Sequence, residues 1–265
     1  MKNNFLKRLI FFISIITIGL VLTGCINTSD KVKLPNLEGM SRAEIKTEMD
    51  KLGLDYVFYF EKRMYQDDSE FDQFVSYEHY KAGNYVDKNE QIYIYTTALS
   101  FTYRISDKVT LDVEYENKNF IKDGIGRVTL ARTIDGDTAH FYCDGVYIKV
   151  RFLGIDTPES TLKKQAWGKA ASDYTKNILQ NAKEIVLESE GARMDVYDRY
   201  LAFVWADGVL LNLQLVENAY TTASMSSNKK YGSIFLEAAV QASKTGRRIY
   251  GEIDPKYDYV NKRFK

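Results

Sequence analysis

Histidine and cysteine are scarce in this chain of 265 residues, which has two of each, and its 36 basic residues balance its 36 acidic residues. A formal net charge of zero argues against a protein that coats nucleic acid through overall charge, so any such contact must come from a local site. With only His79 and His140, a metal site or a catalytic pair built from histidines is excluded. The sequence has no Gly-x-Ser-x-Gly motif and no Walker-type loop, which argues against a serine esterase and a nucleoside triphosphatase.

The N-terminus begins with basic residues and continues into the apolar run Leu9–Leu22. This run is shorter than the roughly 20 residues that span a bilayer, so residues 1–24 are predicted to be a signal peptide. The run ends in Leu22-Thr23-Gly24-Cys25, which resembles the lipobox of bacterial lipoproteins. The resemblance implies acylation of Cys25 and a location outside the cytoplasm, anchored by lipid to the bacterial cell membrane. A plain secretory signal in which Cys25 is incidental is the alternative.

The second cysteine, Cys143, lies in an alternating apolar stretch and is predicted to be a small buried residue. If Cys25 is lipidated, no intramolecular disulfide can form, and the domains must be stabilised by their cores alone. The polar residues 25–33 are predicted to be a tether between the membrane and the first domain.

Residues 34–97 are predicted to form a small α+β domain with a helix followed by strands. Ser41 and Glu44 have the spacing of a capping box, and Gly53 is expected to end the helix. Residues 91–96 alternate as a strand does.

This domain has three further short motifs, and these are Pro35-Asn36-Leu37-Glu38-Gly39-Met40, Leu52-Gly53-Leu54 and Gly83. Together they resemble a PASTA domain, a module found outside bacterial membranes and associated with cell-wall binding or spacing. The resemblance implies peptidoglycan as a partner to be tested. An unrelated small α+β spacer is the alternative.

Residues 98–126 are predicted to be connector strands because apolar side chains alternate along them. The alternating positions are Val109, Leu111, Val113 and Tyr115. Residues 127–254 are then predicted to form the catalytic domain, and residues 255–265 a basic tail.

The catalytic domain is predicted to contain five short strands with interleaved helices, which suggests a closed barrel of OB type. The predicted strands cover residues 128–134, 139–143, 146–155, 184–188 and 200–205. The predicted helices cover residues 165–181 and 211–218, with a last helix that ends at Gly246. In the third strand, Ile148 and Val150 share one face, and Lys149 and Arg151 share the other.

Three motifs follow one another in this domain: Asp135-Gly136-Asp137-Thr138, then Arg151 to Glu159, then Asp195-Val196-Tyr197-Asp198-Arg199. In this order they resemble the staphylococcal nuclease (thermonuclease) family. The resemblance implies a calcium-dependent endonuclease that hydrolyses DNA and RNA to 3′-phosphate products. We expect the protein to be a monomer.

The resemblance also implies the ligands of the Ca²⁺ ion. Asp137 and Asp156 would supply carboxylates and Thr157 a backbone carbonyl, and a hard cation prefers such oxygen ligands. Mutual repulsion of the acidic residues in so small a site would be relieved by a bound cation. Asp135 is instead expected to shape the turn.

Hydrolysis of a phosphodiester requires an activated water and a cationic cradle for the phosphate oxygens. Glu159 is expected to orient or deprotonate the water. Arg151 and Arg199 are expected to bind the phosphate through their guanidinium groups, and Arg199 to assist the leaving 5′-oxygen. Tyr197 would contact a terminal phosphate, a sugar or a base, and a packing role for it is equally open.

The sequence departs from the family pattern at three places. The loop Ser160–Gln165 is short, Val196 replaces a basic residue, and Ser224–Ser227 stands where the founding member has tyrosines that pack on the nucleotide. Two other functions therefore stay open. One is a catalytically weak nucleic-acid-binding module, and the other is a cell-wall-binding lipoprotein.

Overall fold

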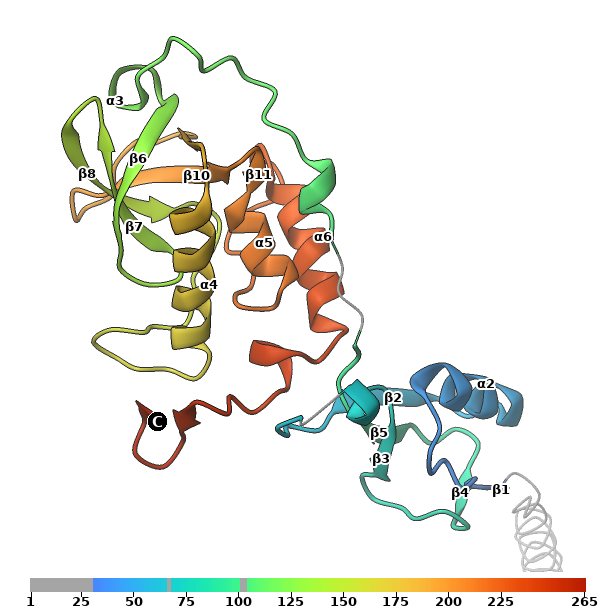
Figure 1. Cartoon of the computed structure of the whole chain (residues 1–265). Coiled ribbons are helices and arrows are strands. Elements are labelled where there is room, and N and C mark those ends of the chain that lie inside the picture. The colour runs from blue at the N-terminus through green and yellow to red at the C-terminus, as the bar shows by residue number, and fades with distance from the viewer. Residues whose placement is uncertain (1–30, 66–67, 101–103) are drawn as a thin grey trace, which may run out of the picture.

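The computed structural model describes residues 31–65, 68–100 and 104–265, which form two units joined by an extended segment (Figure 1). The predicted signal peptide and Cys25 lie outside the described residues. Within these ranges, no helix combines the length and the apolar character that a membrane span requires.

The N-terminal unit combines one helix with short strands, as predicted. Helix α2 (Arg42–Leu52) has Ser41 as its N-cap, whose side chain forms the predicted capping box with Glu44, and Gly53 as its C-cap with φ 67°. A mixed sheet has the strand order β2-β5-β3, and a separate pair joins β1 to β4. The bounds are β1 Lys31–Lys33, β2 Tyr56–Phe60, β3 Phe74–Tyr77, β4 Tyr85–Asp87 and β5 Ile92–Thr96, with a 3-10 turn at Asp68–Glu70.

The core of this unit packs α2 against the sheet, with Ile45 and Met49 of the helix buried against Ile92 and Ile94 of β5. One boundary of the prediction is wrong. Residues 31–33 were expected to belong to the tether, yet they pair with β4 as strand β1. Similarity to a PASTA domain stays a prediction.

The connector differs from its prediction, because the described residues 104–118 contain no strand. A 3-10 turn at Ser106–Lys108 is followed by extended chain and by the short helix α3 (Phe120–Asp123). The four alternating apolar side chains of this segment are partly buried against the barrel core. Packing along the barrel produces the same alternation as strand pairing does, which explains the error.

The second unit is a closed five-stranded barrel, which confirms the predicted OB-type fold. Strands β6, β7 and β8 form an antiparallel meander, β10 runs parallel to β8, and β9 pairs with both β6 and β10 to close the barrel. The bounds are β6 Ile125–Thr133, β7 Thr138–Cys143, β8 Val146–Phe152, β9 Ile185–Glu188 and β10 Tyr200–Ala206, with a short β11 at Val209–Leu210. Cys143 is buried, as predicted.

Three helices accompany the barrel: α4 (Gly168–Asn181) lies between β8 and β9, and α5 (Leu211–Glu217) and α6 (Gly232–Ser243) follow β11. Helix α4 begins three residues later than the predicted Gln165. Trp167 precedes it with φ 68°, outside the helical region, and Gln165 is hydrogen-bonded to the preceding loop.

The predicted basic tail, residues 255–265, contains secondary structure that the sequence analysis did not predict. After a 3-10 turn at Arg248–Tyr250, strands β12 (Tyr257–Asp258) and β13 (Arg263–Phe264) form a small hairpin. Tyr257 is buried and its hydroxyl donates to the carbonyl of Lys164 at 2.7 Å. The tail therefore packs on the loop that leads into α4.

The N-terminal unit contacts the segment that follows α6 (Figure 1). The amide of Leu99 donates to the carbonyl of Thr245 at 2.5 Å, and the amide of Ile253 donates to the carbonyl of Arg63 at 2.8 Å. Phe60 lies against Gly246, where a Cβ atom would be 2.4 Å from the ring. The second unit thus meets the first through backbone as well as side-chain contacts.

Candidate active site

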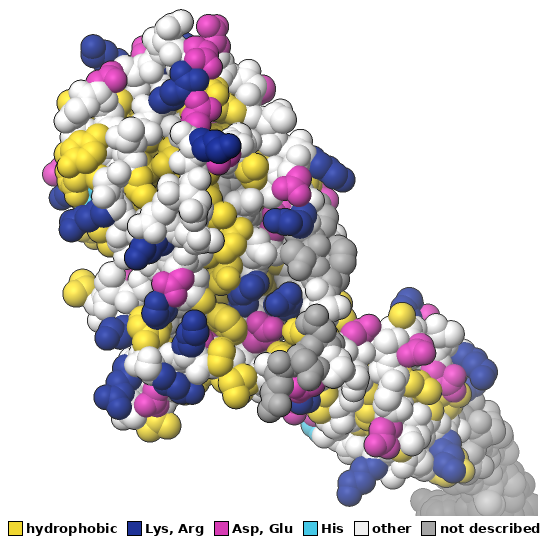
Figure 2. Space-filling model, in the orientation of Figure 1, with side chains coloured by type: hydrophobic (Ala, Val, Ile, Leu, Met, Phe, Trp, Pro, Cys, Tyr) yellow, Lys and Arg dark blue, Asp and Glu magenta, His cyan; other side chains and the backbone are white. Residues whose placement is uncertain are grey.

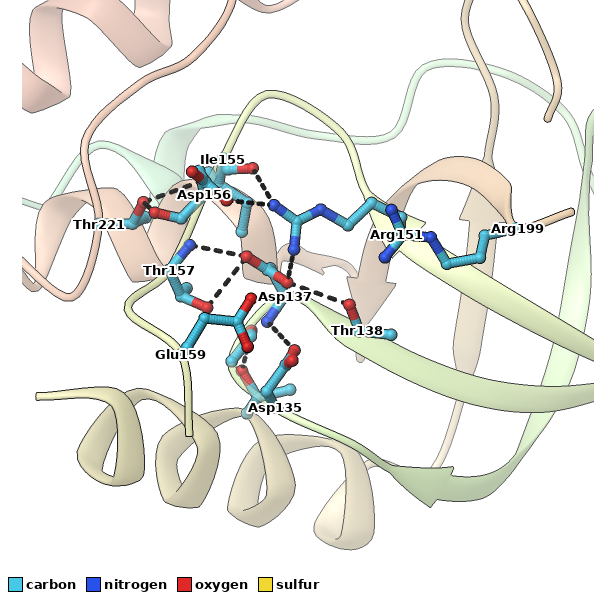
Figure 3. Close-up of polar contacts among 12 residues, drawn as sticks. Asp135, Asp137, Thr138, Arg151, Ile155, Asp156, Thr157, Glu159, Arg199 and Thr221 are labelled. Atoms are coloured by element: carbon cyan, nitrogen blue, oxygen red, sulfur yellow. Dashed lines mark hydrogen bonds and ion pairs between the residues drawn. The ribbon is translucent and has the colours of Figure 1, made fainter. Parts of the chain in front are cut away.

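The site lies at one end of the barrel, where the turn between β6 and β7 meets the end of β8 (Figure 3). Gly136 is required in this turn, because a Cβ atom there would be 2.7 Å from Oγ1 of Thr157 and 2.9 Å from Cβ of Ala171. Thr175 of α4 donates to the Gly136 carbonyl at 2.6 Å. As predicted, Asp135 acts within the turn, where its carboxylate accepts from the Asp137 amide at 3.3 Å.

Asp137 is the most deeply buried acid of the site, with 1% of its surface exposed. One carboxylate oxygen accepts from the amide of Thr157 at 2.7 Å and from its hydroxyl at 3.0 Å. The other accepts from the Thr138 hydroxyl at 3.1 Å and from Nη1 of Arg151. Asp137 therefore ties the first motif to the second.

Arg151 connects the two predicted metal carboxylates. Its guanidinium donates through Nη1 to Asp137 and through Nη2 to Asp156 at 2.5 Å, so that it lies between them in Figure 3. Asp137 is buried, whereas the Asp156 side chain is 75% exposed. Asp137 thus contacts the guanidinium group of Arg151 from the buried side, and Asp156 contacts it from the solvent-exposed side.

Burial raises the pKa of Asp137 to about 6, and the charge of Asp135 adds to this effect. Arg151 and the two donors of Thr157 oppose the increase without cancelling it. Desolvation therefore outweighs the local donors, and the buried carboxylate is short of positive charge. A cation placed at this carboxylate would be stabilised.

The backbone of Asp156 is held in place by Thr221, a residue after helix α5 that the motifs did not indicate. The Thr221 hydroxyl donates to the Asp156 carbonyl at 2.8 Å and accepts from the Asp156 amide at 3.2 Å. Thr221 is 65 positions away in the sequence, and no spacing rule could have identified it.

Glu159 lies in the loop after Thr157, with its side chain half-buried and pointing toward the turn that carries Asp137 (Figure 3). Gln165 fixes its backbone from both sides. The Glu159 amide donates to the Gln165 side chain at 2.7 Å, and the Gln165 amide donates to the Glu159 carbonyl at 2.9 Å. A Cβ atom at Gly168 would lie 2.3 Å from the same carbonyl, so the start of α4 needs glycine there.

Arg199 stands at the start of β10, where Leu201 pairs with Arg151 of β8. Its guanidinium is paired with Asp195 at 2.7 Å and lies 5.5 Å from the centre of the Tyr197 ring. Burial opposes ionisation of Asp195, but hydrogen bonds from Arg199 and from the Tyr197 amide lower its pKa overall. Asp195 is thus an anionic anchor for Arg199, a role that the motif alone did not reveal.

Tyr197 is 72% exposed and projects from the loop before β10. This exposure disfavours the packing role that the sequence left open, and it leaves the ring free to contact a ligand. Val196 beside it is also exposed.

The predicted metal ligands have donor chemistry that suits a hard divalent cation. Asp137 and Asp156 present carboxylate oxygens near one another, and no nitrogen or sulfur ligand is needed. In the described part of the chain, no group of three or more His, Cys, Asp or Glu side chains is arranged to hold a metal ion.

Comparison with known proteins gives consistent results. Residues 149–251 match the family described as Staphylococcal nuclease homologue. The chain is 36% identical to the thermonuclease of Staphylococcus intermedius over 123 residues, which are 45% of this chain and 73% of that protein. It is 37% identical to the thermonuclease of Staphylococcus hyicus over 123 residues, 45% of this chain and 72% of that protein. Endonuclease YhcR of Bacillus subtilis (strain 168) is 33% identical over 137 residues, 47% of this chain and 11% of that protein.

Proposed function

This chain belongs to the staphylococcal nuclease family and is a nuclease, and on that premise we propose that it is a calcium-dependent endonuclease that cleaves DNA and RNA to 3′-phosphate products. The observation that carries this proposal is the convergence of Asp137 and Asp156 on Arg151, with Glu159 held beside them by Gln165. A binding module without catalysis would not need a positioned carboxylate next to a phosphate-binding arginine.

Arg151 and Arg199 are assigned to the phosphate. A guanidinium group offers two parallel donors to phosphate oxygens and stays charged at all working pH values. When the substrate arrives, its phosphate competes with the carboxylates that occupy these donors, namely those of Asp156 and Asp195. Both arginines are already oriented by their carboxylate partners, so little side-chain freedom remains to be lost on binding.

Glu159 is assigned to the attacking water. Its carboxylate is the one acid of the site whose backbone is clamped while its side chain is left half-buried, so it can accept a proton from water near the phosphorus. Arg199 is suited to stabilise the charge that develops on the leaving 5′-oxygen.

Nucleases of this family generally need a divalent metal ion. We assign Asp137, Asp156 and the Thr157 carbonyl as its protein ligands and Ca²⁺ as the ion, because the donors are all oxygen. When bound, the ion would neutralise phosphate charge and lower the pKa of a water.

The test is hydrolysis of plasmid DNA and of a single-stranded RNA by the full chain, with Ca²⁺, with Mg²⁺ and with EDTA. We expect cleavage in Ca²⁺, little in Mg²⁺, which demands a tighter octahedral shell, and none in EDTA. The termini of the products should carry 3′-phosphates. The matched control is Glu159→Gln, which preserves shape and removes the base. Full cleavage in EDTA, or by this variant, would refute the mechanism.

The location is a separate part of the proposal. We propose that Cys25 is acylated and that the nuclease acts at the outer face of the bacterial membrane, with the N-terminal unit facing the cell wall. The support is the Leu22–Cys25 motif and the similarity of residues 34–97 to a PASTA domain. A pull-down of the full chain on insoluble peptidoglycan tests the wall contact, and its absence from the pellet would remove that partner.

A further inference from the structure

The outer face of the barrel carries side chains that the proposed catalytic step does not use. On β8, Tyr147, Lys149 and Arg151 alternate with the buried Ile148 and Val150, so all three project from one face. A strand rise of about 3.3–3.4 Å per residue separates successive side chains on that face by about 7 Å. The face therefore begins at the catalytic arginine and leads away from it.

Neighbouring strands extend this face sideways. In the β7–β8 register, His140 lies opposite Lys149 and Tyr142 lies opposite Tyr147. In the β6–β7 register, Arg132 lies opposite His140. We call these five residues the outer-face cluster.

The cluster is internally ordered. The Tyr147 hydroxyl is 2.5 Å from Nδ1 of His140, and Nε of Arg132 donates to the same nitrogen at 3.3 Å. Because Arg132 can only donate, Nδ1 is the acceptor and the ring proton is on Nε2. The rings of Tyr142 and Tyr147 lie 5.5 Å apart, edge to face, and these residues stay 44% and 43% exposed. Two aromatic rings are thus held in place while nearly half their surface is open.

The cluster also has positive charge that is not neutralised. Among the described residues, no carboxylate lies within the 4.0 Å ion-pair distance of Arg132 or Lys149. Burial lowers the pKa of His140, and the charges of Arg132 and Lys149 lower it further, which reports a positive local potential. Asp144, in the adjacent hairpin turn, accepts a hydrogen bond from the Asn119 side chain at 2.5 Å. Figure 2 shows basic and hydrophobic side chains side by side over this part of the barrel.

We propose that the outer-face cluster binds the part of a single-stranded nucleic acid that extends beyond the scissile phosphate. Lys149 and Arg132 contact backbone phosphates, and Tyr147 and Tyr142 stack on unpaired bases. A basic surface interleaved with aromatic rings is the combination that holds single strands without sequence preference, and barrels of this type bind oligonucleotides across these strands. In a duplex the bases are already stacked and paired, so the rings have nothing to stack on. This inference rests on the proposed function and adds an extended substrate site to it.

The first test measures binding alone. Fluorescence anisotropy of a labelled 16-nucleotide single strand is recorded with the full chain in detergent and EDTA, where no cleavage is expected. Tyr147→Ala should weaken binding about 5-fold or more, because stacking contributes strongly per base. Lys149→Gln should weaken it and reduce the slope of log K against log salt by about 0.7, the value for one lost phosphate contact on a single strand. Tyr85→Ala and Lys88→Gln, exposed residues of the N-terminal unit, are the matched controls and should bind as wild type.

Two further measurements identify the cause of any loss of affinity. Tyr147→Phe keeps the ring and should retain affinity, which separates stacking from loss of the bond to His140. With Ca²⁺, kcat/KM of Tyr147→Ala should fall at least 5-fold more for the 16-mer than for a dinucleotide. Each variant's melting temperature is measured first, and only folded variants are compared.

Three results would overturn the inference. One is unchanged single-strand affinity in both Tyr147→Ala and Lys149→Gln. Another is an equal loss of rate on the dinucleotide and the 16-mer, which would place the effect at the catalytic site. A third is an equal loss of affinity for a duplex of the same sequence, which would make the face a duplex-binding surface. If the wild type binds through this face and yet never cleaves, the proposed function fails while the inference stands.

Discussion

Removing the charge of Asp137 should stabilise the metal-free protein at neutral pH, although it abolishes activity. The pKa of this buried carboxyl is raised from 3.8 to about 6 in the folded protein, mainly by burial. An increase of this size corresponds to about 3 kcal/mol of unfavourable native-state energy once the group is ionised. Asp137→Asn keeps the shape and removes the ionisation.

The increase in the free energy of unfolding is expected to be smaller than this maximum, about 1–2 kcal/mol. The Thr157 amide can only donate, so it selects the oxygen of the new Asn side chain and turns the NH₂ group toward Arg151. Arg151 loses one partner and keeps its bond to Asp156. For a chain of this size, such a gain would raise the metal-free melting temperature by a few degrees per kcal/mol.

The pH dependence gives the sign of the effect. A carboxyl whose folded pKa is raised binds its proton more tightly in the native state, so its contribution to stability is present at pH 4 and is lost as pH rises toward 6. The stability difference between Asp137→Asn and wild type in EDTA should therefore be small at pH 4 and should grow between pH 4 and pH 7. Calcium at 100 times its Kd should then increase the free energy of unfolding of wild type by about 2.7 kcal/mol and leave that of the variant unchanged.

The assay is thermal unfolding at pH 4, 5, 6 and 7, in EDTA and in Ca²⁺. Asp156→Asn is the matched control, because that side chain is exposed and its ion pair should contribute less than about 1 kcal/mol. Asp156→Asn should also lose the increase in melting temperature that calcium causes. In EDTA it should not melt at a higher temperature than wild type. Two results would contradict the conclusion that burial destabilises the ionised Asp137 carboxylate. One is that Asp137→Asn melts below wild type at pH 7 in EDTA, and the other is that the difference between their melting temperatures does not vary with pH.

Three other predictions follow from the site and the N-terminus. Glu159→Gln and Arg199→Ala should each lower kcat about 10²–10³-fold while the melting temperature stays within about 2 °C of wild type, and wild-type rates in folded variants would contradict their roles. Gln165→Ala should lower kcat several-fold with KM unchanged, because one hydrogen bond to the Glu159 amide is lost, and Gln165→Glu should restore the rate by keeping the acceptor oxygen. Mass spectrometry of the detergent-extracted protein should show diacylglycerol on Cys25 as the first residue, and a mature chain that begins after this position would refute lipidation.

Local patterns in the sequence were sufficient for much of the barrel. The alternation in β8 placed Ile148 and Val150 inside and Lys149 and Arg151 outside, and the structure agrees because a strand has a side-chain period of two. The capping box at Ser41 was equally readable, since both of its partners lie within one helical turn. The family resemblance carried by the three motifs predicted Asp137 and Asp156 in one site, and in the structure both accept hydrogen bonds from Arg151.

Predictions from local patterns were wrong where two different structures would produce the same pattern. In those places a long-range contact decides which structure forms. The alternating residues 109–115 were predicted to be a strand, but among the described residues they pair with no strand, and their apolar side chains pack on the barrel core instead. The tail was predicted only as a basic segment, yet the Tyr257 hydroxyl donates to the Lys164 carbonyl, 93 positions earlier. Neither outcome depends on the neighbours in sequence, so neither could be predicted from them.

The sequence by itself determined the residue types of the site, the strand periodicity and the order of the motifs. Only the tertiary structure decided that Gln165 clamps Glu159, that Thr221 holds Asp156, and that Arg132, His140 and Tyr147 form one surface. The physical reason is that strand register and loop packing bring together residues that are far apart in the sequence, as Thr221 and Asp156 show with a separation of 65 positions.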